Sequence, residues 1–247
     1  MKSIHNKISR NINNSSLRDD EDLQILDTLS AISGINKLKI LEVGSGECRF
    51  VKKIQKMFPQ IGITCVEINP QLAEIAKELG CNVINKNILD IQATEKYDVV
   101  HCSHVIEHFS YPDITKVLDY LVHSVKPNGF LFLRSPLIDR DDTWCFYGNI
   151  DHIKPYPPQS IINYFELQQQ QKKGEADFNI EKIWYRTSPK QFEHISTWHL
   201  LYGIKILRKP INSFINVINK LLKKLWIRYR WPSTRPNGYV LILKILS

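Results

Sequence analysis

Short apolar runs alternate with amphipathic segments along most of the chain. Seven runs rich in β-branched and aliphatic residues predict strands, at 38–43, 63–66, 82–84, 97–102, 129–133, 180–186 and 239–246. Apolar residues at helical spacing predict helices before or between these runs, at 19–32, 48–58, 71–79 and 114–125. Apolar strands that alternate with helices are typical of a parallel sheet covered on both faces. The pattern therefore predicts a doubly wound α/β domain.

The composition agrees with one globular domain that begins near residue 19. The chain has 247 residues, 43% of them hydrophobic, and has no apolar run suited to a secretory signal or a bilayer-spanning helix. Residues 1–18 are polar, so we expect a flexible arm there and a single domain over 19–247. The five cysteines, an odd number without a CxxC pair, predict buried reduced thiols in a cytoplasmic protein.

The positive charge is concentrated near the C-terminus. The formal net charge is +8, but no Asp or Glu follows Glu193, so the basic excess belongs to the last part of the chain. A basic insertion is expected at 187–238, where apolar residues recur at helical spacing opposite lysines. Its apolar stripe could pack on the domain or on a second copy in a homodimer, and its segment 205–231 could contact an anionic membrane. RNA binding is a third alternative and the least favoured of the three.

The turn after the first predicted strand carries the residue types of a nucleotide site. Gly44 and Gly46 permit a tight turn and a close approach of a ligand to the backbone. Arg49 replaces the third glycine of a dinucleotide motif, and Glu42 would repel a pyrophosphate. Glu42 would instead attract a cationic amino-acid tail, while Glu67 is placed to bond ribose hydroxyls. These properties together predict S-adenosylmethionine (SAM) as the cofactor.

Five segments resemble, in the correct order, the motifs of the class I SAM-dependent methyltransferases. They are residues 40–46, 66–69, 87–90, 97–100 and 125–129, within a resemblance that covers about 38–136. The resemblance implies methyltransferase activity and a Rossmann-like sheet of seven strands, mostly parallel, with the last strand antiparallel. It also implies that SAM is bound by Glu42, Gly44, Ser45, Gly46, Glu67, Ile68, Asn87, Ile88 and Ser103.

A second group of candidate residues follows the fourth predicted strand. If a helix begins near Ser103, it places His104, Glu107 and His108 on one face. The string matches the inverted zinc-protease motif, but we reject that interpretation because the string follows a buried strand and does not lie within a long helix. Three roles stay open for the group: a metal site, a general base without a metal, or hydrogen bonds that fix the loops.

The same segment resembles the Glu-His segment of ubiquinone-pathway and small-RNA methyltransferases, which with a later histidine can hold a divalent metal. His152 is such a histidine, and His104 stands where those relatives tend to have Glu, which suits softer ions than Mg²⁺. The predicted catalytic residues, and the candidate metal ligands, are therefore His104, Glu107, His108 and His152.

The segment 139–157 leads to an expectation about the acceptor. Its aromatic and acidic residues suit a sugar hydroxyl of a glycan or glycolipid precursor, and it resembles methyltransferases encoded with surface-glycan machinery. RNA, a quinone or another lipid are alternative acceptors. An alternative of another class is a non-catalytic binding subunit with the same fold. The expected location is cytoplasmic, at the inner face of the membrane if the basic insertion binds lipid.

Overall fold

The computed structural model describes residues 15–32, 37–138, 144–171, 177–187 and 236–246. The chain divides into two compact units, one of residues 1–186 with 236–247 and one of residues 187–235. Apart from residue 187, the second unit lies outside the described residues, as do residues 1–14. The three alternatives for the basic insertion therefore stay predictions.

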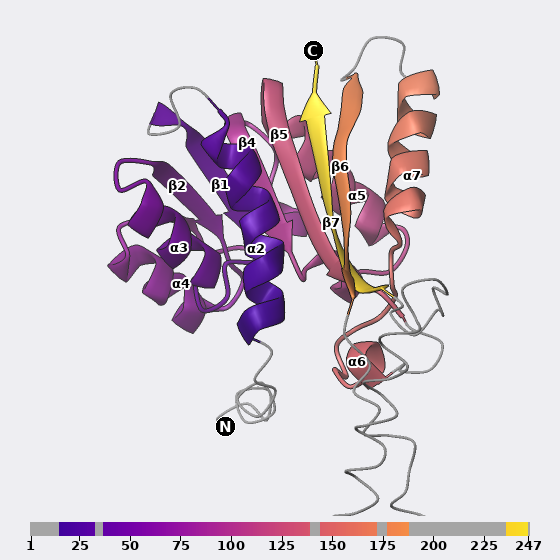
Figure 1. Ribbon diagram of the computed structural model, residues 1–247, viewed down its shortest axis with the longest axis horizontal. Coiled ribbons are helices and arrows are strands. Elements are labelled where there is room, and N and C mark those ends of the chain that lie inside the picture. Colours follow the sequence, from indigo (N-terminus) through magenta and orange to yellow (C-terminus); the bar gives the residue numbers. More distant parts are fainter. Residues whose placement is uncertain (1–14, 33–36, 139–143, 172–176, 188–235, 247) are drawn as a thin grey trace, which may run out of the picture. The chain divides into compact units, whose positions relative to one another are not determined.

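All seven predicted strands are present in one sheet (Figure 1). They are β1 (Lys39–Val43), β2 (Gly62–Val66), β3 (Asn82–Ile84), β4 (Tyr97–Ser103), β5 (Val125–Pro136), β6 (Phe178–Thr187) and β7 (Pro236–Ile245). Their order is β3-β2-β1-β4-β5-β7-β6, with β1 to β5 paired in parallel and β7 antiparallel to β5. The doubly wound fold with an antiparallel last strand is confirmed. The strand order reverses between β1 and β4, which is where open sheets of this kind bind ligands.

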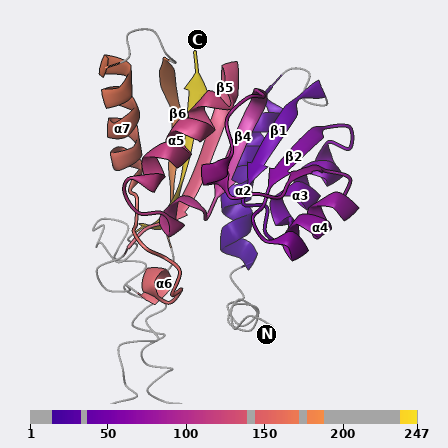
Figure 2. The same ribbon diagram turned by 180° about the vertical axis from the view of Figure 1, so that it is seen from behind.

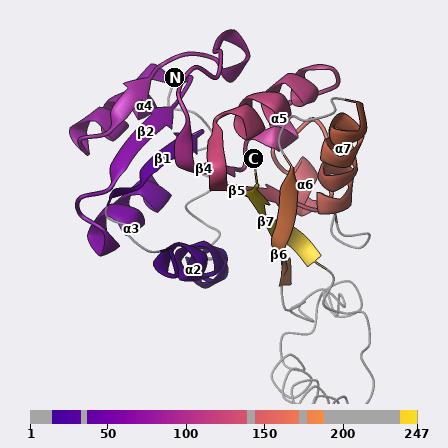
Figure 3. The same cartoon turned by 90° about the horizontal axis from the view of Figure 1, so that it is seen from above.

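Neighbouring residues of each central strand belong to two different cores, one on each face of the sheet. Ile40 and Val99 pack with the helices α2 (Ser15–Ser30), α3 (Arg49–Met57) and α4 (Pro70–Glu78). Leu41 and Val100 pack on the other face with α5 (Asp113–His123) and α7 (Pro158–Gln171). Figure 2 shows α5 in front of the middle strands, and Figure 3 shows α2 on the opposite side. The strands are apolar on both faces because helices cover both.

The described residues bear on the predictions about membrane-spanning helices and about the cysteines. None of the described helices has the length and apolarity that a bilayer crossing requires. Cys48, Cys65, Cys81 and Cys102 are buried free thiols, as predicted, while the side chain of Cys145 lies outside the described residues.

The structure differs from the predicted elements at several points: α7 was not among the predicted helices, β5 begins at Val125, and two further differences concern the arm and the candidate site. The helix α2 begins at Ser15, so residues 15–18 are helical where an arm was expected. The helix predicted from Ser103 is absent, and only a short 3₁₀ turn, η3 (Ile106–His108), forms there. Ser103 still pairs with Arg134 in the sheet, and His104 has a φ of 56°, which a right-handed helix cannot contain.

Candidate active site

The carboxyl ends of β1, β2, β4 and β5 lie at one edge of the sheet, and the segments that follow them carry the predicted site residues. The first of these segments is the glycine turn after β1. Gly44 has a φ of 73° and Gly46 a φ of 50°, a region that glycine adopts without strain. A Cβ on Gly44 would lie 2.3 Å from Cγ2 of Val105, whereas a Cβ on Gly46 would meet no atom within 4 Å. The turn is thus packed on one side and open at Gly46.

Glu67 connects this turn to the loop after β2. Its carboxylate is almost fully buried and accepts hydrogen bonds from the backbone N–H of Gly46, at 2.9 Å, and of Asn69, at 3.0 Å. Each carboxylate oxygen has a second lone pair, so the ribose hydroxyls of a nucleoside can still be accepted. The Asn85 side chain donates to the carbonyl oxygen of Glu67 at 2.6 Å and holds the loop in place. Sequence reasoning missed Asn85, although it follows β3 at the same edge.

The remaining predicted cofactor residues near these loops differ in their surroundings. Ile68 is 63% exposed, which offers an apolar surface beside Glu67, while Ile88 is buried. The Asn87 side chain accepts from the backbone N–H of Leu89 at 3.0 Å and caps the 3₁₀ turn η2 (Ile88–Asp90). Oγ of Ser45 is buried and has no partner within the described part of the chain. An unpartnered hydroxyl, an open glycine and an exposed apolar side chain fit a nucleoside ligand such as SAM.

Glu42 faces a buried histidine that sequence reasoning missed. Glu42 and His101 are opposite each other in the β1–β4 pairing, and Nδ1 of His101 lies 2.6 Å from Oε2 of Glu42. Both side chains are buried, and the His101 ring stacks on Phe50 with the centroids 3.9 Å apart. The available signal was the alternation along β4, which places His101 on the same face of the sheet as Val99 and toward α3.

Ser103 belongs to a buried charged network. Arg134 donates from Nε to Oγ of Ser103 at 2.7 Å and from a guanidinium nitrogen to Asp22 of α2 at 2.6 Å. Asp22 also forms an ion pair with Lys53 of α3. Burial opposes ionisation of Asp22, but Arg134 and Lys53 outweigh it and hold the pKa of this carboxyl below its usual value. The network ties two helices to the end of β4.

The buried Glu107 pairs with the partly exposed His104 despite the absence of the predicted helix. Nδ1 of His104 lies 3.2 Å from Oε1 of Glu107, and Ser135 donates to Oε2 of Glu107 at 3.1 Å. Burial lowers the pKa of His104. Burial alone would raise the pKa of Glu107, but the contact with His104, the backbone N–H of Glu107 and the nearby His108 together outweigh it and lower that pKa. The two directions describe a neutral imidazole that donates to an ionised carboxylate.

His108 ends the turn η3 and His152 lies on a loop, and both are held by carbonyl oxygens. Nδ1 of His108 lies 3.0 Å from the carbonyl oxygen of Asp151, so its Nε2 carries the lone pair in the neutral ring. Nδ1 of His152 lies 2.8 Å from the carbonyl oxygen of Phe146, and Nε2 lies 3.1 Å from Nδ2 of Asn149. This geometry assigns the Nδ1–H tautomer to His152, with Nε2 accepting from Asn149.

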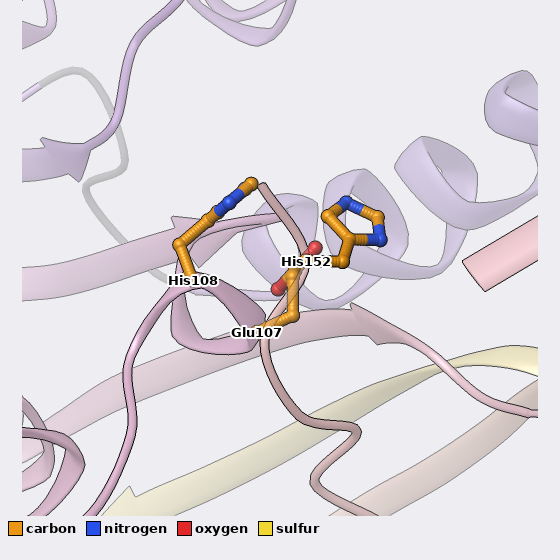
Figure 4. Close-up of side chains that lie close together, drawn as sticks. All are labelled: Glu107, His108 and His152. Carbon is orange, nitrogen blue, oxygen red and sulfur yellow. The ribbon is translucent and has the colours of Figure 1, made fainter. Parts of the chain in front are cut away.

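Glu107, His108 and His152 together have the donor set of a cation site. Their ligand atoms all lie within 4.8 Å of one another, and Figure 4 shows the Glu107 carboxylate beside the His152 ring with His108 reaching the same space. Two imidazoles with a carboxylate suit a transition metal better than Mg²⁺. His104 contacts Glu107 but lies outside this group of three. The residues present therefore fit a divalent ion, with three of the four predicted ligands.

Comparisons with known proteins relate the chain to methyltransferases. A sequence model of the family described as "Methyltransferase domain" matches residues 41–131, which include the glycine turn, Glu67 and Glu107. The chain is 27% identical over 200 residues to the ubiquinone biosynthesis O-methyltransferase of Rickettsia typhi, with 76% of this chain and 79% of that protein covered. It is 32% identical over 141 residues to the protein of the same name from Rickettsia felis, with 55% and 56% covered. The second match thus spans little more than half of that relative.

Solved structures show the same architecture at low sequence identity. A SAM-dependent methyltransferase from Archaeoglobus fulgidus matches with a TM-score of 0.58 and 19% identity, over 92% of this chain and 94% of that chain. The N-methyltransferase NodS from Bradyrhizobium japonicum WM9, in complex with S-adenosylhomocysteine (SAH), matches with a TM-score of 0.57 and 14% identity, over 95% and 90%. At this level of identity the likeness concerns the fold.

Proposed function

Because the chain belongs to the class I SAM-dependent methyltransferases, we propose that it methylates a hydroxyl oxygen of a quinone precursor. The observation that carries the proposal is the Glu107–His108–His152 group, which lies at the same sheet edge as the cofactor turn. When bound, SAM supplies a methyl group that is activated by the positive charge on sulfur. What the protein must add is alignment of the acceptor oxygen and removal of its proton.

On the cofactor side, the proposed binding residues are the glycine turn and the two acids. Glu67 is fixed by two backbone N–H groups and would accept the ribose hydroxyls. Gly46 leaves room for the ligand, and Glu42 would attract the ammonium group of the amino-acid tail. Ile68 would pack on the adenine, because its side chain is exposed beside this acid.

On the acceptor side, we assign proton removal to His108. Its Nδ1 is held by the carbonyl oxygen of Asp151, so the Nε2 lone pair is available for the proton of an acceptor hydroxyl. Glu107 would accept a hydrogen bond from a neighbouring hydroxyl. A divalent metal held by Glu107, His108 and His152 would be an alternative means of deprotonating the acceptor, because a metal gathers two adjacent hydroxyls and lowers their pKa.

A phenolic acceptor with adjacent hydroxyls is favoured over a sugar. Both curated relatives described above carry the name ubiquinone biosynthesis O-methyltransferase. The expectation of a sugar site depended partly on exposed aromatic rings in residues 139–157. Phe146, however, is fully buried and packs against the His152 ring, so it serves the core of the loop. Tyr147 is exposed, and residues 139–143 lie outside the described residues.

The test is a methyl-transfer assay with the full chain, SAM and three acceptors. They are a prenylated dihydroxybenzoate, a monosaccharide panel and a mixed RNA, and each is assayed after chelation and again with Mg²⁺, Mn²⁺ or Zn²⁺. We expect one added methyl group on the dihydroxybenzoate by mass spectrometry. His108→Ala should remove this activity without weakening SAH binding. Methylation of the sugar or the RNA in place of the phenol would overturn the acceptor assignment.

A further inference from the structure

We propose that His101 is a positioning residue that holds the Glu42 carboxylate in the orientation that recognises the amino-acid tail of the cofactor. The inference rests on the proposed role of Glu42 in cofactor binding. It concerns a residue in the interior of β4 that no motif singled out. The observations that carry it are a short contact, complete burial and an unpartnered ring nitrogen.

The pairing of β1 with β4 places the two side chains opposite each other on one face of the sheet. Nδ1 of His101 and Oε2 of Glu42 are 2.6 Å apart, which is short for a nitrogen–oxygen hydrogen bond. Glu42 is 3% exposed and His101 is 0% exposed, so water does not compete for this contact. A hydrogen bond to a buried carboxylate is worth more than one between neutral groups.

The protonation state of the pair follows from the other ring nitrogen. Nε2 of His101 is buried and has no hydrogen-bond partner among the residues that the structure describes. An imidazolium would bury a second N–H without an acceptor, which is costly, whereas a neutral ring leaves only a lone pair there. The geometry therefore favours a neutral His101 that donates from Nδ1 to an ionised Glu42. The carboxylate keeps its charge and has Oε1 left for a ligand.

Phe50 holds the His101 ring in place, and the ring in turn holds the Glu42 carboxylate. The Phe50 and His101 rings are stacked, with centroids 3.9 Å apart, and Phe50 belongs to the helix α3 that follows the glycine turn. A carboxylate that lost its donor in this buried place would be free to rotate. The attraction for an ammonium group would then fall, while the ribose and adenine contacts around Glu67 would remain.

This separation defines a test by calorimetry on the purified full chain without acceptor. SAH carries the ammonium tail, whereas 5′-methylthioadenosine has the same nucleoside without that tail. We expect the wild type to bind SAH more tightly than 5′-methylthioadenosine. His101→Leu should weaken SAH binding by about tenfold and leave 5′-methylthioadenosine binding unchanged. His101→Asn keeps an N–H donor close to the position of Nδ1 and should restore part of the difference.

Glu42→Gln is the matched comparison, because it removes the charge and leaves the histidine. The double variant Glu42→Gln with His101→Leu should bind SAH no more weakly than Glu42→Gln alone, since one residue acts through the other. Equal losses for both ligands in His101→Leu would mean general damage to the site and would overturn the inference. Unchanged SAH binding in His101→Leu would also overturn it. A wild type that does not distinguish the two ligands would instead refute the proposed role of Glu42.

Discussion

The cofactor side of the site is held by buried contacts between strands, whereas the acceptor side is assembled from side chains on loops. We call residues 42–46, 67–69 and 101–103 the cofactor half, and residues 104–108 and 146–154 the acceptor half. In the cofactor half, Glu67 bonds two backbone N–H groups and Glu42 bonds His101, all within or beside the sheet. In the acceptor half, His108 and His152 are only partly buried and are tethered to carbonyl oxygens.

The difference indicates how one fold can keep its cofactor and change its acceptor. The loop with His152 is attached to η3 mainly through its backbone, because the N–H groups of Ile153 and Lys154 both donate to the carbonyl oxygen of Glu107. Such tethers place no demand on the neighbouring side chains, which can vary with the acceptor. Side chains of the cofactor half also support the sheet. Substitutions in the cofactor half should therefore cost stability, and those of the partly exposed His108 and His152 in the acceptor half should cost activity alone.

The largest effect is expected for Asp22→Asn, in the network that supports the end of β4. This variant leaves Arg134 without its closest charged partner, and removal of one member of a buried ion pair destabilises by about 3 kcal/mol. Urea unfolding measures the change, with Asp113→Asn as the control, because the Asp113–Lys116 pair is exposed. A loss equal to that of the control would show that the network does not stabilise the fold.

The same residue leads to a pH dependence of defined sign. The pKa of Asp22 is lower in the folded protein than its ordinary value of 3.8, so its contribution is complete above that value and is lost as the pH falls through the folded pKa. Between about pH 5 and pH 2 the wild type should lose more stability than Asp22→Asn. Equal losses of unfolding free energy in the wild type and in Asp22→Asn over that range would contradict the prediction.

The next effect concerns the glycine turn, where Gly44→Ala and Gly46→Ala form a matched pair. Both positions have a positive φ, so both alanines should bear a strain of about 1 to 2 kcal/mol. Only the Cβ at Gly44 would collide with Val105, at 2.3 Å. Thermal unfolding should therefore show a larger loss for Gly44→Ala, by about a further 1 kcal/mol or more. Equal losses would mean that Val105 moves aside freely.

A smaller free-energy change, confined to function, is expected in the acceptor half. His108→Ala should weaken divalent-metal binding by at least about tenfold, as measured by calorimetry after chelation, because one of three ligands is lost. The free energy of unfolding should change by less than about 1 kcal/mol, since the His108 side chain is 31% exposed. His123→Ala, at the end of α5, is the control and should leave metal binding unchanged.

The sequence predicted the cofactor half better than the acceptor half, for a physical reason. Gly44, Gly46 and Glu67 lie at strand ends, where local spacing already determines which edge of the sheet they reach. The contacts of Glu42 and Ser103 could not be predicted, because they depend on the register of β1, β4 and β5. That register brings His101 and Arg134 beside them, although each lies far away along the chain.

In the acceptor half, helical spacing led to the wrong element. His104, Glu107 and His108 have the spacing of one helical face, but pairing with β5 extends β4 to Ser103 and a positive φ follows at His104. The contact between His104 and Glu107 forms nevertheless, through a tight turn. The place of His152 came from a resemblance to relatives. The tether that brings it to Glu107 is made by the backbone, which leaves no side-chain pattern to detect.

The smallest expected effect is a change in metal affinity, and it tests whether His152 binds the metal. Its Nε2 accepts a hydrogen bond from Asn149, so a metal could use that nitrogen only after this bond breaks. Such a bond contributes about 1 kcal/mol, and Asn149→Ala should therefore tighten metal binding by about fivefold. Asn163→Ala, on the exposed side of α7, is the control. Unchanged affinity in Asn149→Ala would mean that His152 does not bind the metal and that its ring, fixed by Phe146, only shapes the acceptor half.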